Sequence, residues 1–139
     1  MWLRTRTSAR GERGTATAFV VGFAVVLLAC AGLVIDGGNA INARMKLADD
    51  VEQAARAGAG AIDIDALRAG GALTLDENEA EARALTYMGR LNYTDVTAQA
   101  TGDSVAVSAE DTVSTTLLQL VGKGTFTISA TATADAVTQ

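Results

Sequence analysis

The chain contains one long uncharged run, from residue 14 to residue 35, in which apolar side chains occur on every face of the expected helix. A helix needs about 20 apolar residues to cross a hydrocarbon core of about 30 Å, and this run has 22 positions. The rest of the chain is too small and too poor in aromatic residues to enclose a helix that is apolar all round. We therefore predict a transmembrane helix over residues 14–35.

The pattern becomes amphipathic after this run. Between residues 36 and 60, small or apolar side chains recur at helical spacing among charged residues: Ile41, Met45, Ala48, Ala55 and Ala59. This predicts a helical extension whose apolar side either leans on a small domain of the same chain or packs against a partner helix. Two alternatives remain for this helix. Gly37 and Gly38 bend it, since glycine costs about 1 kcal/mol relative to alanine in a helix. Otherwise residues 15–58 form one unbroken rod of about 65 Å.

Residues 61–139 are predicted to form a small extracytoplasmic head. A helix is expected over 75–91, where Thr74 and Glu77 have the spacing of a capping box. The period then becomes alternating, which predicts strands over residues 94–100, 104–113 and 124–137. The link between the last two strands offers apolar side chains to fill a core: Leu117, Leu118, Leu120 and Val121.

The predicted fold class is therefore α+β. A long N-terminal transmembrane helix, pilin-like in its placement, is followed by a head of one or two helices and a three-stranded antiparallel sheet.

Charge is distributed unevenly along the chain and predicts the membrane topology. Residues 1–13 carry four arginines and one acid, whereas 15 acidic and 7 basic residues occur from Asp36 onward. By the positive-inside rule, the basic segment 1–13 is cytoplasmic and the head is extracytoplasmic, with Asp36 at the outer boundary of the span. The acidic head argues against a nucleic-acid partner, because binding phosphates requires clustered Lys and Arg.

The residue inventory excludes several kinds of site. The chain has no histidine and one cysteine, so it cannot form a His/Cys zinc site, an intrachain disulfide or a Ser-His-Asp active site. No motif supports a hydrolase based on paired carboxylates. We expect a protein that is not an enzyme, with no cofactor, no metal and no small-molecule substrate.

Cys30 supports an alternative. Leu27-Leu28-Ala29-Cys30 has the form of a lipid-attachment box after an arginine-rich head and an apolar run. In that case everything before Cys30 is removed, and the protein is a surface lipoprotein that serves as an envelope binding module. The apolar run continues to Ile35, which favours a retained anchor. Ordinary signal cleavage at another position is the third alternative.

The segment 10–59 resembles the N-terminal signature of TadE/TadG-like proteins of Tad (Flp) pilus assembly systems, in the short form common in actinobacteria. The motifs that carry the resemblance are Glu12-Arg13-Gly14, Leu33-Val34-Ile35-Asp36-Gly37-Gly38 and Ala54-Ala55-Arg56-Ala57-Gly58-Ala59. The resemblance implies a non-catalytic, single-pass, pilin-like membrane protein of a pilus assembly or related secretion system. Its implied partners are the lipid bilayer and other Tad proteins or pilin-like helices.

The sequence departs from the family pattern at one position. Pilins and TadE-type pseudopilins are cleaved after a glycine and carry a glutamate five residues on. Gly14 is the candidate processing site by this pattern, but Phe19 occupies the fifth position after it. The sequence is closer to the TadG-like side of the family, in which the signal is retained as an anchor.

Overall fold

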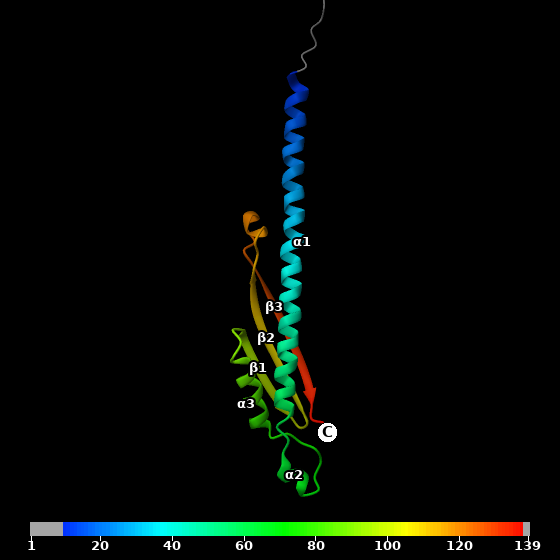
Figure 1. Cartoon of the computed structure of the whole chain (residues 1–139), viewed down its shortest axis with the longest axis vertical. Coiled ribbons are helices and arrows are strands. Elements are labelled where there is room, and N and C mark those ends of the chain that lie inside the picture. The colour runs from blue at the N-terminus through cyan, green and yellow to red at the C-terminus, as the bar shows by residue number, and fades with distance from the viewer. Residues whose placement is uncertain (1–9, 138–139) are drawn as a thin grey trace, which may run out of the picture.

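The computed structural model describes residues 10–137, in which the C-terminal half of one long helix packs against a small head (Figure 1). Part of the predicted cytoplasmic segment 1–13, including Arg4 and Arg6, lies outside the described residues. The predicted α+β fold class is confirmed. The elements in chain order are α1 (Arg10–Ala59), α2 (Ile64–Arg68), α3 (Glu77–Met88), β1 (Thr94–Thr101), β2 (Ser104–Ser114), the 3-10 helix η1 (Leu118–Val121) and β3 (Thr125–Asp135).

Helix α1 is a single unbroken rod. Its 50 residues correspond to about 75 Å at 1.5 Å per residue. The helix continues through Gly37 and Gly38, so the unbroken form of the two expected alternatives is the one observed. The half that follows Asp36 packs on the head, whereas the half that precedes it extends well beyond the head (Figure 1).

The three strands form one antiparallel sheet, as predicted, and their order in it is β1-β2-β3. Strands β2 and β3 pair continuously from Ser104 opposite Asp135 to Ser114 opposite Thr125. Strands β1 and β2 are joined by the expected turn at Gly102 and Asp103, where Gly102 adopts a φ of 63°. Glycine tolerates this left-handed conformation at little cost, which explains its place in the turn.

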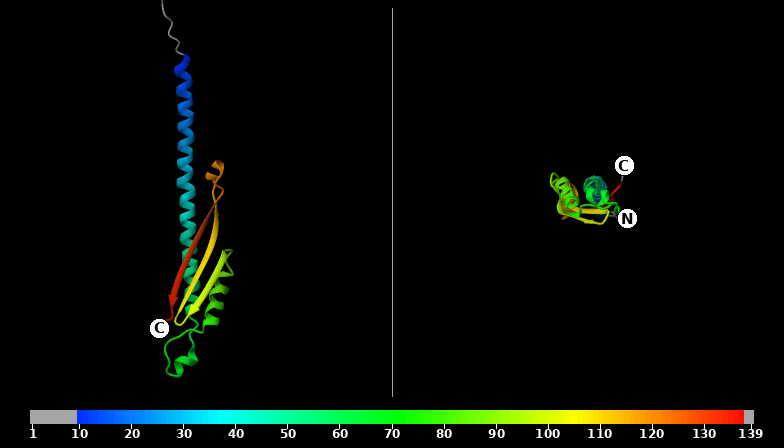
Figure 2. Two further views of the ribbon diagram at one scale, coloured as in Figure 1. Left: turned by 180° about the vertical axis from the view of Figure 1, so that it is seen from behind. Right: turned by 90° about the horizontal axis from the view of Figure 1, so that it is seen from below.

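Helices α1 and α3 cover the same face of the sheet, as the view from below shows (Figure 2). Helix α1 lies over β2 and β3, and α3 lies over β1. The core between the helices and the sheet is built largely from small side chains: Leu47, Val51, Ala54, Ala55, Ala80, Ala84, Met88, Val105, Val107 and Ala109. Alanine at five of these positions lets the backbones approach closely.

Helix α3 begins two residues later than predicted. Its N-cap is Asp76, whose side chain accepts a hydrogen bond from the Glu79 N–H at 3.1 Å. The predicted capping box of Thr74 and Glu77 is therefore wrong. Leu75 forms an isolated bridge with Ile62, and this pairing keeps the chain extended up to Asp76.

The β2–β3 link is the second correction. Leu117, Leu118 and Leu120 do not enter the core of the head, because the hairpin projects past β1 and α3 along α1 (Figure 1). The description does not include the Val121 side chain. We call residues 115–124, which contain η1, the hairpin tip. Gly122 closes η1 with a φ of 87°.

Candidate functional site

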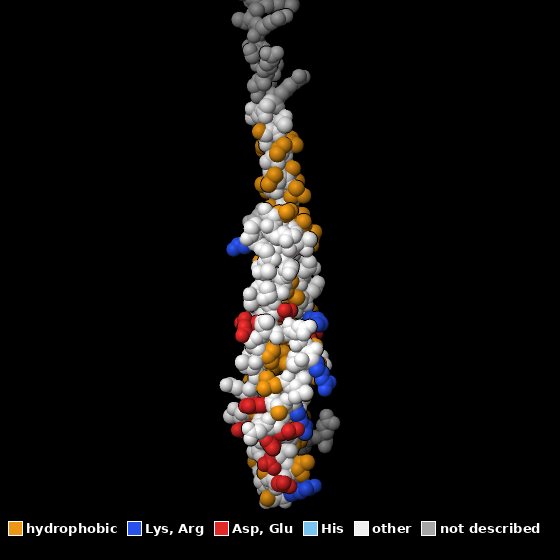
Figure 3. Space-filling view, turned by 90° about the vertical axis from the view of Figure 1, so that its left-hand side faces the viewer, with side chains coloured by type: hydrophobic (Ala, Val, Ile, Leu, Met, Phe, Trp, Pro, Cys, Tyr) orange, Lys and Arg blue, Asp and Glu red, His pale blue; other side chains and the backbone are white. Residues whose placement is uncertain are grey.

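The half of α1 that precedes Asp36 exposes apolar side chains on every face. Phe19, Leu28 and Val34 are 72%, 70% and 75% exposed. Hydrophobic side chains gather on this part of the molecule, whereas acidic and basic side chains lie over the head (Figure 3). From Gly14 on, the helix is long and apolar enough to cross a membrane. Exposure of this much apolar surface to water is unfavourable, so an apolar environment is the expected surrounding.

Asp36 joins this apolar half to the hairpin tip. Its side chain is 2% exposed, although it follows directly on the uncharged run. The carboxylate accepts three backbone hydrogen bonds, from the N–H groups of Thr116 at 2.8 Å, Leu117 at 2.9 Å and Leu118 at 2.7 Å. We call this arrangement the Asp36 clasp. It fixes the start of η1 to α1 across 80 residues of sequence.

The clasp stabilises the charged form of the carboxyl group. Burial acts to raise the pKa of Asp36, but the N–H groups of Leu118, Thr116 and Leu117 bring that pKa below its ordinary value. Hydrogen bonds from several backbone N–H groups favour an ionised carboxylate. Asp36 therefore holds the tip as an anion at neutral pH.

Glycine at position 32 permits the close approach of the tip. A Cβ placed on Gly32 would lie 2.9 Å from the Cβ of Leu117, nearer than such carbon atoms normally approach. Beyond this contact, Leu117, Leu118 and Leu120 line an apolar groove of about 280 Å³ with Val25 and Leu28 of α1. The tip therefore lies beside the predicted span itself, not above it.

The structure divides the five residues predicted as a helix-packing surface. Ala55 and Ala59 pack against the chain's own head and are 0% and 8% exposed. Ile41 and Met45 are each 62% exposed, and Ala48 is also exposed. These three residues, which we call the exposed stripe, lie on the part of α1 that follows Asp36. The exposed stripe is accessible to a helix of another protein, whereas Ala55 and Ala59 already pack against the head of the same chain.

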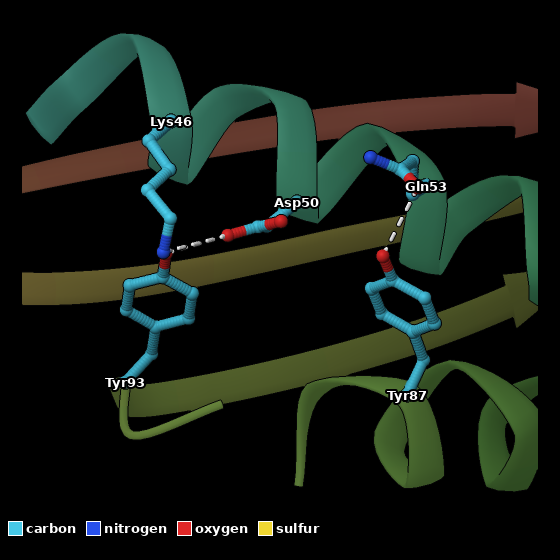
Figure 4. Close-up of polar contacts among 5 residues, drawn as sticks. All are labelled: Lys46, Asp50, Gln53, Tyr87 and Tyr93. Atoms are coloured by element: carbon cyan, nitrogen blue, oxygen red, sulfur yellow. Dashed lines mark hydrogen bonds and ion pairs between the residues drawn. The ribbon is translucent and has the colours of Figure 1, made fainter. Parts of the chain in front are cut away.

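Two tyrosines of the head form hydrogen bonds with α1 residues that follow the exposed stripe in sequence (Figure 4). The Tyr87 hydroxyl donates to Gln53 Oε1 at 3.1 Å, and the Tyr93 hydroxyl donates to Asp50 Oδ2 at 2.6 Å. Lys46 Nζ lies 3.7 Å from the same Asp50 oxygen and donates to the Tyr93 hydroxyl at 3.4 Å. Burial of the Tyr93 side chain raises its pKa, and the hydrogen bond to Asp50 raises that pKa further.

The Tyr93 contact predicts a pH dependence of stability. Because its pKa is raised in the folded state, its contribution is fully present below the ordinary value of 10.0 and is lost as pH rises through the folded pKa. Tyr93→Phe should lower the free energy of unfolding by about 1 kcal/mol at neutral pH, with a smaller difference from the wild type above pH 10. Thermal unfolding in detergent micelles over this pH range measures both effects.

Tyr87→Phe is the matched control, since it removes a hydroxyl that donates to the neutral Gln53. A Tyr93→Phe variant that keeps the wild-type alkaline profile would show that the Asp50 contact does not contribute to stability.

The remaining predicted positions lie on α1. Gly14 is in the first turns of the helix. Cys30 is exposed on its apolar half and follows Ala29, which lines the groove beside the hairpin tip. Within residues 10–137, no group of three or more acidic or cysteine side chains is placed to hold a metal ion.

The comparisons with known proteins bear on this same helix. Residues 14–61 match the family model Tad, described as "Putative Flp pilus-assembly TadE/G-like". We call these residues, which are similar to that family, the TadE/G-like segment. The match confirms the resemblance seen in the sequence, and it spans the apolar half of α1, Asp36 and the exposed stripe. No curated protein and no solved structure matches the chain.

The TadE/G-like match and the membrane-length helix support a component of pilus assembly. The Asp36 clasp is the feature of the TadE/G-like segment that sequence reasoning missed. From the sequence, Asp36 is only an acid at the end of an apolar run, and its three partners lie in a link of weak pattern. No local signal in either stretch predicts that they meet.

Proposed function

We propose that this protein is a non-catalytic, single-pass, pilin-like membrane component of a Tad-type pilus assembly or related secretion system. Residues 14–35 span the membrane, the basic segment 1–13 is cytoplasmic, and the helical extension 36–60 and the head 61–139 are extracytoplasmic. The observation that carries the proposal is the TadE/G-like segment on a helix whose residues 14–35 are uncharged and expose largely apolar side chains.

The arrangement of the head supports this topology. The buried α1 residues in the core of the head all follow Asp36: Leu47, Val51, Ala54 and Ala55. The hairpin tip approaches α1 earlier, at Gly32. Residues 14–35 form about 33 Å of helix at 1.5 Å per residue, which matches the hydrocarbon thickness of a bilayer. The acidic residues of the chain lie at or beyond position 36, apart from Glu12.

Membrane extraction and protease accessibility test the topology. The chain should stay in the membrane pellet at alkaline pH, and protease added outside should remove the head and leave a protected fragment that contains the span. Release of the intact chain at alkaline pH would contradict the span. Protection of the head would contradict the orientation.

The exposed stripe supports a role in assembly. Ile41, Met45 and Ala48 follow each other at helical spacing on a surface that the head leaves uncovered. We propose that the exposed stripe packs against a helix of another pilus-assembly protein. The other predicted alternative, packing on a small domain of the same chain, applies to Ala55 and Ala59, which the head covers.

Ile41→Glu tests this contact. A charge buried at a helix–helix contact without a partner is costly, and every 1.4 kcal/mol or so lost reduces association about tenfold. We expect roughly tenfold fewer surface pili by electron microscopy, at an unchanged level of membrane-inserted protein.

Asn42→Glu is the matched control, because Asn42 is the exposed neighbour of Ile41 on α1 and gains the same charge. Normal pili in Ile41→Glu, or an equal loss in Asn42→Glu, would contradict a contact through the exposed stripe.

A further inference from the structure

We propose that the hairpin tip is a second membrane-contacting element, which inserts the side chains of Leu117, Leu118 and Leu120 into the outer leaflet beside the transmembrane helix. This inference rests on the proposed span of residues 14–35. Its partner is the acyl-chain region of the lipid bilayer, not another protein.

The position of the tip along α1 carries the inference. Leu117 of the tip approaches Gly32 closely, and the tip lines one groove together with Val25 and Leu28. Those positions fall in the C-terminal half of the span, and Val25 is about 15 Å along the helix from Ile35, the last residue of the span, at 1.5 Å per residue. A bilayer core of about 30 Å places this stretch in the outer half of the membrane. An element that touches α1 there is surrounded by the same lipid as the helix.

The side chains of the tip suit that position. Leu120 is 80% exposed, and it lines an apolar groove with Leu117, Leu118 and the α1 residues. The apolar surface of the tip is thus continuous with the lipid-facing surface of α1. Lys123, also in the tip, is exposed, and the long apolar stem of a lysine lets its charge reach the headgroups from beside apolar surface.

The backbone of the tip is also suited to an environment without water. An unpaired N–H group in hydrocarbon costs several kcal/mol, so irregular segments are excluded unless their polar groups are satisfied within the protein. The N–H groups of Thr116, Leu117 and Leu118 donate to Asp36. Those of Leu120, Gly122 and Lys123 donate to carbonyl groups of the tip itself.

The Asp36 clasp then serves both partners. The Asp36 carboxylate accepts the hydrogen bonds of the first N–H groups of the tip. The tip in turn covers this carboxylate, which is 2% exposed. An acid at the end of a span is costly unless it is paired or hydrogen-bonded. At one depth along α1, the described residues therefore combine an apolar surface, backbone N–H groups that are hydrogen-bonded within the protein, and a buried carboxylate.

Site-directed spin labelling of the full chain in phosphatidylcholine–phosphatidylglycerol liposomes tests the inference. Cys30→Ser removes the single cysteine of the sequence, and Leu120→Cys supplies the labelling site at an exposed side chain. Collisions of the label with molecular oxygen, which concentrates in hydrocarbon, are compared with collisions with a polar nickel chelate, which stays in water. Leu27→Cys in the span and Ala69→Cys in the head are the lipid and water references.

We expect oxygen to be the more frequent collider at positions 27 and 120 and the nickel chelate at position 69. Nickel dominance at 120 with oxygen dominance at 27 would overturn the inference and leave the span intact. Nickel dominance at 27 would overturn the span itself. Low collision rates for both reagents at 120, with spin–spin broadening, would identify a second copy of the chain as the occupant and would also overturn the inference.

Discussion

Asp36→Ala is expected to release the hairpin tip from α1. In the wild type, the amide hydrogens of Thr116, Leu117 and Leu118 are held by one buried carboxylate. The variant leaves all three without an acceptor, and buried backbone donors are almost always paired. Hydrogen exchange of the full chain in detergent micelles should show these three amides exchanging at the rate of exposed groups, while Val107 and other sheet amides keep their protection.

Two further variants sharpen this test. Asp49→Ala is the matched control, because Asp49 is an exposed acid on the same helix. Asp36→Asn keeps one acceptor oxygen and should give intermediate protection. Unchanged exchange at residues 116–118 in Asp36→Ala would mean that the clasp does not hold the tip.

The clasp also has a predicted pH window. The pKa of Asp36 lies below its ordinary value of 3.8 in the folded state, so its contribution is present above that value and is lost as pH falls through the folded pKa. The tip should therefore remain attached at pH 3.8 and detach only in stronger acid. Detachment well above that pH would contradict the anionic clasp.

Gly58→Val is expected to destabilise the head. A Cβ on Gly58 would lie 2.8 Å from the carbonyl oxygen of Ala80, and 3.1 Å from a methyl carbon of Val105. Neither the α3 backbone at Ala80 nor the buried side chain of Val105 can turn aside. The helices α1 and α3 therefore have to move apart to admit a side chain at position 58. Overpacking of this kind costs about 1–3 kcal/mol, and each kcal/mol lowers the Tm of a domain of this size by roughly 4–8 °C.

Gly38→Val is the matched control on the same helix. A Cβ there meets nothing within 4 Å, and the change in helix propensity from glycine to valine is common to both variants. Thermal unfolding in detergent micelles should give a lower Tm for Gly58→Val than for Gly38→Val. Equal values would mean that the α1–α3 approach is looser than the structure has it.

The elements with strong local patterns were predictable from the sequence. The uncharged run gave the apolar half of α1, and the alternation of Val105, Val107 and Ala109 gave β2 with its buried face. The turn at Gly102 and Asp103 follows from glycine's access to positive φ. The motifs around Gly14, Asp36 and Ala55 gave the resemblance that the family model confirms over residues 14–61.

The features set by contacts distant in sequence were not predictable. The start of α3 depends on the pairing of Leu75 with Ile62, which no local spacing reveals. Helical spacing placed Ala55 beside Ile41 on one predicted surface, but the head covers the first and leaves the second exposed. The leucines of the tip read as core residues because apolarity alone does not tell a protein core from a lipid-facing surface.

The central claim is that residues 14–35 stay in the mature protein as its membrane anchor. Intact-mass spectrometry of the chain extracted from membranes, with sequencing of its N-terminus, tests this claim most directly. The account predicts a chain that begins at or before residue 15, contains the whole apolar half of α1 and carries no acyl group on Cys30. A chain that begins at an acylated Cys30, or one that begins after Ile35, would contradict it.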